Sequence, residues 1–217
     1  GPGKTIKTTG SSQITGTRSY LDAAWACSPI DLAALGQALA TTNDNVLIPK
    51  TSGGKNPLSG SSPPDLTLSG SETLVLPAGT YYLGKITIGG SSVLSVSGNV
   101  RILATGKVSL SGSSKVNDAG SPIAFRLFTS GTTFTLDGSA RLKGFVYASG
   151  AAAAVKVAGS GVFVGGLYGG QLTLDGSVTL TRDVVYVPPA DPLVLAITES
   201  GQPLAEGALF ARAVTPV

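Results

Sequence analysis

The sequence predicts an all-β fold: a parallel β-helix of about six coils and three faces, with an N-terminal α-helical cap and a C-terminal β tail. Two observations predict it. A six-residue phrase, apolar–x–apolar–x–Gly–Ser, occurs six times, and successive copies start 20, 22, 26, 21 and 17 residues apart. Self-similarity near a 20-residue period is typical of solenoids, whose coils bury apolar surface only against neighbouring coils. The copies begin at Leu66, Ile86, Val108, Phe134, Val155 and Leu172.

Each phrase has the alternation of a strand followed by a corner. Its two apolar residues point to one side and its middle residue to the other, and Gly permits the turn. Two further apolar runs follow, such as Thr73–Leu76 and Tyr81–Leu83, which predicts three short strands per coil. Coils about 4.8 Å apart would stack like residues in columns, and irregular coil lengths favour a right-handed helix. The expected inner columns are Leu66, Ile86, Val108, Phe134, Val155, Leu172 and Leu68, Ile88, Leu110, Leu136, Val157, Leu174.

Composition narrows the possible functions. Charged residues make up 12%, and the net charge of +3 is scattered, which does not indicate a nucleic-acid partner. The chain has no His and one Cys, so a His-based catalytic relay and a Cys/His zinc site are excluded. The sequence contains no apolar run of 18 residues, so it predicts no membrane span. We therefore expect no enzymatic activity, no metal and no cofactor. The single Cys27 is expected to be a small buried residue, with an intermolecular disulfide as the alternative.

Residues 1–64 are predicted to form an arm, a capping helix and a loop. Ser28 suits an N-cap and Pro29 the first helical position, and an apolar stripe continues to about Thr41. We expect this helix to cover an open end of the solenoid, with partner binding as the alternative. The start Gly1-Pro2-Gly3 looks processed, so a targeting segment is expected to precede it. The remaining expectations are a polar arm or degenerate coil over 1–18, a short helix over Ser19–Ala26, a strand over Asn45–Pro49 and a loop over Thr51–Asp65.

The solenoid is expected over 65–187 and a tail over 188–217. Two apolar segments around Ser200-Gly201 predict a β-hairpin. These strands either fold back over the last coil or pair with another molecule by strand addition. The candidate self-association residues are Leu193, Val194, Leu195, Ile197, Leu204, Leu209 and Phe210.

The middle residues of the six phrases predict an outward-facing column. A row of Thr at coil spacing is a candidate surface for ice or glycans, although Thr also suits exposed strand positions through its β-branch. Lys156 interrupts this row. The candidate ladder residues are Thr67, Thr87, Ser109, Thr135 and Thr173.

Two other alignments allow a structural and a functional interpretation. Asp137 and Asp175 share one slot of the repeat, about 10 Å apart, near the upper range for an inverting carboxylate pair. Asp-Gly is also a favoured corner sequence, because Asp bonds its own turn. The aromatic residues form either a packing ladder or a sugar-stacking surface. They are Phe128, Tyr147, Tyr168 and Tyr186.

The run from Leu66 to Tyr186 resembles a bacterial family of Gly/Ser-rich β-helical surface domains. The resemblance is carried by Ala78–Leu83, Leu142–Ala148, Val162–Tyr168 and the Ser-Gly-Ser corners. Such domains commonly follow a type IV pilin-like segment, which implies export and display at the cell surface. A weaker similarity links the coils to ice-binding β-solenoids and to bactofilin filaments, which polymerise end to end.

These expectations give a leading functional hypothesis and two alternatives. The leading one is a non-enzymatic extracellular structural protein that self-associates, into a fibre or surface layer, by stacking of solenoid ends or exchange of terminal strands. The first alternative is a monomeric surface adhesin that binds glycans or ice along one flat face. The second is a carbohydrate-active enzyme, which the missing site argues against. The expected partners are copies of itself or a surface glycan.

Overall fold

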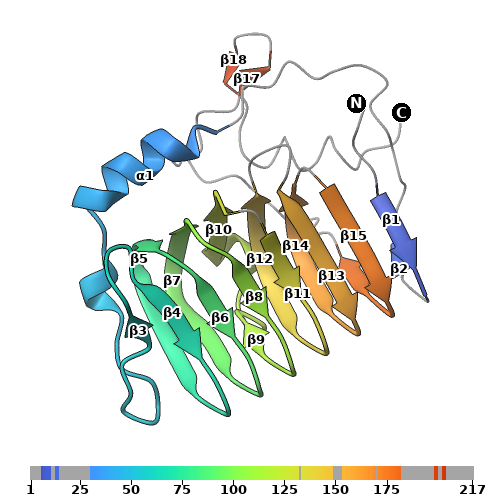
Figure 1. Cartoon of the computed structure of the whole chain (residues 1–217), viewed down its shortest axis with the longest axis horizontal. Coiled ribbons are helices and arrows are strands. Elements are labelled where there is room, and N and C mark those ends of the chain that lie inside the picture. Colours follow the sequence, from blue (N-terminus) through green and yellow to red (C-terminus); the bar gives the residue numbers. More distant parts are fainter. Residues whose placement is uncertain are drawn as a thin grey trace.

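A computed structural model shows a parallel β-solenoid with one α-helix along its side (Figure 1). It describes residues 6–10, 13–14, 30–131, 133–148, 153–169, 171–181, 198–199 and 202–203. Most strands form two eight-stranded sheets. The predicted fold class is therefore confirmed.

The first sheet contains the six Gly-Ser phrases, one strand per phrase. Neighbouring strands pair in parallel and in register, so the chain makes about five turns between the first and the last. A short antiparallel strand, β3 (Leu58–Ser59), lies at one end, and β1 (Ile6–Thr9) lies at the other. The six are β4 (Asp65–Leu68), β6 (Ile86–Ile88), β8 (Val108–Leu110), β11 (Thr133–Leu136), β13 (Ala154–Gly159) and β15 (Gln171–Gly176).

The second sheet corrects the prediction of three separate strands per coil. In several coils the second and third apolar runs belong to one long strand that continues past the middle corner. In the pair β5–β7 the register shifts between Pro77 and Gly79. The strands are β5 (Thr73–Leu83), β7 (Val93–Ala104), β9 (Lys115–Val116), β10 (Phe125–Thr129), β12 (Arg141–Ala148), β14 (Val162–Tyr168), β16 (Thr179–Thr181) and β2 (Gln13–Ile14).

Both predicted inner columns are confirmed. Leu66 pairs with Ile86 and Leu68 with Ile88, and the register continues unbroken to Leu172 and Leu174. Eleven of the twelve side chains are buried, and Leu172 is partly buried. The longest repeat, from Val108 to Phe134, accommodates an excursion that contains the 3-10 helix η2 (Pro122–Ala124). The Asn117 side chain holds this excursion by donating to the Ser121 and Lys143 carbonyls, at 2.8 and 2.9 Å.

The glycines of the phrases form a corner column that, from the second coil onward, has no room for a side chain. Each has a positive φ, between +63° and +94°. From the second coil onward, an added Cβ would lie 2.5–2.8 Å from the carbonyl oxygen of the glycine one coil earlier. The same oxygen accepts a hydrogen bond from the next coil's Ser amide, at 2.6–2.7 Å. The column contains Gly70, Gly90, Gly112, Gly138, Gly159 and Gly176.

Helix α1 (Leu32–Thr41) lies along the solenoid and does not close an end. It ends at Thr41 as predicted. The prediction of Ser28 as N-cap is wrong, because the Asp31 carboxylate accepts from the Ala33 and Ala34 amides. The apolar stripe of the helix packs on outward-facing aromatic side chains of the second sheet. This packing explains why α1 lies along the side of the solenoid.

The predicted strand over Asn45–Pro49 is also wrong. Residues Asn45–Leu47 form a 3-10 helix, η1. The Asn45 amide donates to the Asn43 side chain at 3.1 Å, a local bond that competes with an extended backbone. The predicted short helix over Ser19–Ala26, and Cys27, lie outside the described residues.

We predict that Gly112→Ala destabilises the protein more than Gly70→Ala. Both substitutions place Ala at a similar φ, +69° and +63°, but nothing lies within 4 Å of a Cβ at Gly70. At Gly112 the Cβ would lie 2.6 Å from the Gly90 carbonyl oxygen. The difference in the free energy of unfolding should be about 1–3 kcal/mol, measured by urea denaturation. Equal losses for the two variants would contradict the stacked corner.

Candidate functional site

The predicted ladder is present on the outer face of the first sheet. The register places Thr67, Thr87, Ser109, Thr135, Lys156 and Thr173 on successive strands, and β1 continues it with Lys7 beside Thr173. Thr67 and Lys156 are exposed and the other four are half-buried. The ladder is therefore a straight file of hydroxyl groups at coil spacing, interrupted by one ammonium group.

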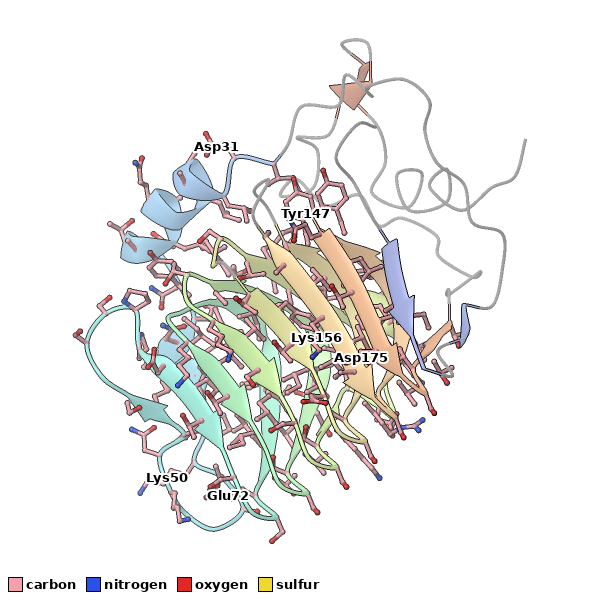
Figure 2. The ribbon with its side chains drawn as sticks, turned by 45° about the vertical axis from the view of Figure 1, so that its right-hand side comes forward. Asp31, Lys50, Glu72, Tyr147, Lys156 and Asp175 are labelled. Atoms are coloured by element: carbon pink, nitrogen blue, oxygen red, sulfur yellow. The ribbon has the colours of Figure 1, made fainter. Side chains whose placement is uncertain are left out.

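The two aspartates of the repeat take structural roles next to this file. Asp137 bonds its own corner, because its Oδ1 accepts from the Gly138 amide at 2.7 Å. Asp175 lies diagonally from Lys156 on the neighbouring strand, where its register partner is Ala158, with 3.7 Å between carboxylate and ammonium, and both face outward (Figure 2). The Asp137 bond is the one that the corner interpretation predicts, whereas Asp175 forms an ion pair with Lys156.

The aromatic column is a packing ladder beneath α1. Phe128 and Tyr147 are buried, each 6% exposed, and pack against Ile30, Leu32 and Leu39. The rings of Tyr147 and Tyr168 stack 4.7 Å apart, and those of Phe128 and Tyr147 are tilted at 6.3 Å. The register extends this ladder to Tyr82 and Leu103, which the spacing of aromatic residues alone did not identify. The fourth predicted member, Tyr186, lies outside the described residues.

Tyr147 also fixes the start of the helical segment. Its hydroxyl accepts a hydrogen bond from the Ile30 amide at 3.2 Å, just before α1 (Figure 2). Burial of the ring raises the pKa of the Tyr147 hydroxyl to about 12. The protonated hydroxyl is therefore favoured in the folded protein.

The first coil, which contains β4 and β5, forms one end of the solenoid, called the near end. Side chains cover this end in the place of a further strand. The amide group of Asn45 donates to the Tyr82 carbonyl at 2.6 Å and accepts from the Tyr82 amide at 3.0 Å. Asp44 does the same for Thr80, accepting from its amide at 2.7 Å while its own amide donates to the Thr80 carbonyl at 2.8 Å. With β3 paired to β4, these bonds satisfy much of the backbone edge of the first coil.

The last coil, which contains β15 and β16, forms the opposite end, called the far end. The N-terminal segment completes it. β1 pairs with β15 and β2 pairs with β16, both in parallel. Ile6-Lys-Thr-Thr-Gly-Ser11 is a seventh, degenerate copy of the phrase, with Thr8 at the second apolar position. Gly10 extends the corner column beyond Gly176, with φ +68°. The prediction of a degenerate first coil or an arm is thereby corrected: the segment is a coil, but it stacks after the last phrase.

The candidate self-association residues of the tail, Leu193 to Phe210, lie outside the described residues. Between them the structure describes a hairpin, β17 (Thr198–Glu199) paired antiparallel with β18 (Gln202–Pro203). The two strands flank Ser200-Gly201 in the sequence, around which the hairpin was predicted.

The described residues contain no group of three or more His, Cys, Asp or Glu side chains that could hold a metal ion. Nor does any helix among them have the length and apolar character needed to cross a membrane. Residues 84–186 match a family described as a domain of unknown function (DUF7305). That range contains five of the six phrases, so the chain is similar to this family from the second phrase to the sixth. No curated protein and no solved structure gives a significant match.

Asn45→Asp should destabilise the near end. The substitution keeps an oxygen to accept from the Tyr82 amide but places a second oxygen against the Tyr82 carbonyl. Losing this bond and opposing two acceptors should lower the free energy of unfolding by about 1–3 kcal/mol. Asn56→Asp is a matched control, because the Asn56 side-chain oxygen accepts from the Leu58 amide and an Asp oxygen can do the same. If thermal denaturation gave equal losses for both variants, the cap would not have the proposed role.

Tyr147→Phe should make stability less sensitive to alkaline pH. The folded-state pKa of about 12 exceeds the ordinary value of 10. Between these values the unfolded chain loses a proton that the folded protein retains, so wild-type stability should fall as pH rises from 10 to 12. The Phe variant lacks this contribution, so its urea midpoint should fall less over the same range. Identical pH profiles would show that burial does not shift this hydroxyl.

Proposed function

We propose that this chain is a non-enzymatic extracellular structural protein of a bacterial surface that self-associates, into a fibre or filament, by stacking of solenoid ends or exchange of terminal strands. One observation carries the proposal. The outermost coil at the far end consists of β1 and β2, which come from a segment remote in sequence from β15 and β16. The end of the stack therefore accepts a strand that is not the next one along the chain.

The use of carboxylates supports a structural role. Each of the seven Asp and Glu residues between residues 30 and 181 bonds a backbone amide or a basic side chain. Asp31, Asp44, Asp65 and Asp137 accept from backbone amides. The other three are Glu72 with Lys55, Asp118 with Arg141 and Asp175 with Lys156, at 3.1, 2.9 and 3.7 Å.

The test of self-association is electron microscopy combined with light scattering on the purified chain. We expect the full chain to form filaments or large assemblies as concentration rises. A chain that lacks residues 192–217 tests whether the tail is the donor: assemblies by the full chain alone would assign the exchange to the tail. Monomers from both chains at high concentration would contradict the proposed function.

The alternative, a monomeric adhesin, is favoured by the in-register ladder. A flat file of hydroxyls can bind a repeating ligand by matched contacts along several coils. Replacing Thr87 and Thr135 together by Glu should abolish binding to surface glycans on an array, or thermal hysteresis in ice. Thr179→Glu, at an exposed position of the second sheet, should leave either activity unchanged. No binding and no hysteresis by the wild-type chain would exclude this alternative.

A further inference from the structure

The N-terminal strands occupy the edge of the last coil as any internal coil would. Ile6 is opposite Leu172 and Thr8 is opposite Leu174, in line with the two inner columns. At the second sheet, Gln13 and Ile14 are opposite Thr179 and Leu180. Gly10 approaches Gly176 closely, with a would-be Cβ 3.1 Å from its Cα. The far end is thus a strand-accepting edge, and the short strands β1 and β2 fill it.

Without β1 and β2 this edge would be open. β15 and β16 would present unpaired backbone groups, which template pairing with another chain. The near end differs, because Asp44, Asn45 and β3 satisfy its edge from the segment that immediately precedes the first coil. The two ends of the solenoid are therefore not equivalent, and only the far end depends on a segment remote from its neighbours in the chain.

The connection from this strand pair is long enough to reach another molecule. Fifteen residues separate Ile14 from Ile30. The Ile30 amide donates a hydrogen bond to the hydroxyl of Tyr147 on β12. β12 lies three strand steps from β2, through β14 and β16, which is about 15 Å along the stack. Fifteen residues can span up to about 50 Å. The length exceeds what pairing within one molecule requires.

We propose that β1 and β2 are exchangeable donor strands, and that in assemblies they fill the β15 and β16 edge of a second copy. The proposal rests on the self-association proposed above and specifies its donor and acceptor. The backbone pairs are the same within one molecule and between two. The effective concentration of the donor strands therefore decides whether β1 and β2 pair within their own chain or with a second copy. A tether favours the intramolecular pair in dilute solution, and crowding of copies favours exchange.

Directed cross-linking tests this pairing. In a Cys27→Ser background, one chain carries Lys7→Cys and a second carries Thr173→Cys, because these two residues are register partners. Paired strands are about 4.8 Å apart, within the range of Cα separations that a disulfide bridges. The two chains are unfolded together, refolded at high concentration and oxidised. We expect a covalent heterodimer on a non-reducing gel, with the disulfide between positions 7 and 173 identified by mass spectrometry of the linked peptides.

Ser109→Cys provides the matched control for Thr173→Cys. It lies in the same outward column but three strands from β15, which is too far from β1 for a disulfide. A chain with both Lys7→Cys and Thr173→Cys should cross-link within one molecule when refolded dilute. Strand exchange is overturned if this double variant cross-links internally while the mixture gives no heterodimer. It is equally overturned if the Ser109 control gives as much dimer, or if neither arrangement cross-links.

The experiment separates this inference from the proposed function. Assemblies seen by electron microscopy without the disulfide between positions 7 and 173 would leave self-association standing and assign it to another contact, such as the tail. Absence of assemblies together with absence of the disulfide would remove both. Covalent heterodimers in the same assemblies would support both.

Discussion

The hydrogen bond between each corner glycine carbonyl and the next coil's serine amide is the constraint on which the architecture depends. Five such bonds, from Ser91, Ser113, Ser139, Ser160 and Ser177, measure 2.6–2.7 Å. They hold successive corners so closely that a side chain on the glycine cannot fit. Once the corners coincide, strand alternation places every inner and outer column. The buried apolar columns and the outward-facing row of hydroxyl groups are therefore two consequences of one repeated contact.

A stack of this kind requires a solution for its two ends, and the residues before the first phrase supply both. Side chains of Asp44 and Asn45 substitute for a strand at the near end. β1 and β2 add a coil at the far end, and α1 between them covers the aromatic ladder. One N-terminal region thus contacts the solenoid at both ends and along one side. Any assembly by end contacts must involve or displace parts of this region.

Much of the fold was predictable because stacking converts sequence period directly into spatial register. The two inner columns and the outward ladder follow from the phrase alone. The far coil was not predictable in this way, since Thr8 breaks the apolar pattern and its neighbours in space are more than 150 residues away. The near-end cap uses single side chains, which leave no periodic signal. The polar run Asn43-Asp-Asn45 was the available indication, because such side chains readily bond backbone groups.

Native-state hydrogen exchange of the corner serine amides, followed by NMR, tests the central constraint most directly. All six serines of the phrases are exposed, so solvent access alone predicts similar exchange rates. In the stacked arrangement, five amides are bonded to the preceding coil, whereas Ser71 begins the column and has no earlier corner glycine to bond. The account predicts slow exchange for Ser91, Ser113, Ser139, Ser160 and Ser177 and fast exchange for Ser71. Equally fast exchange at all six would contradict it.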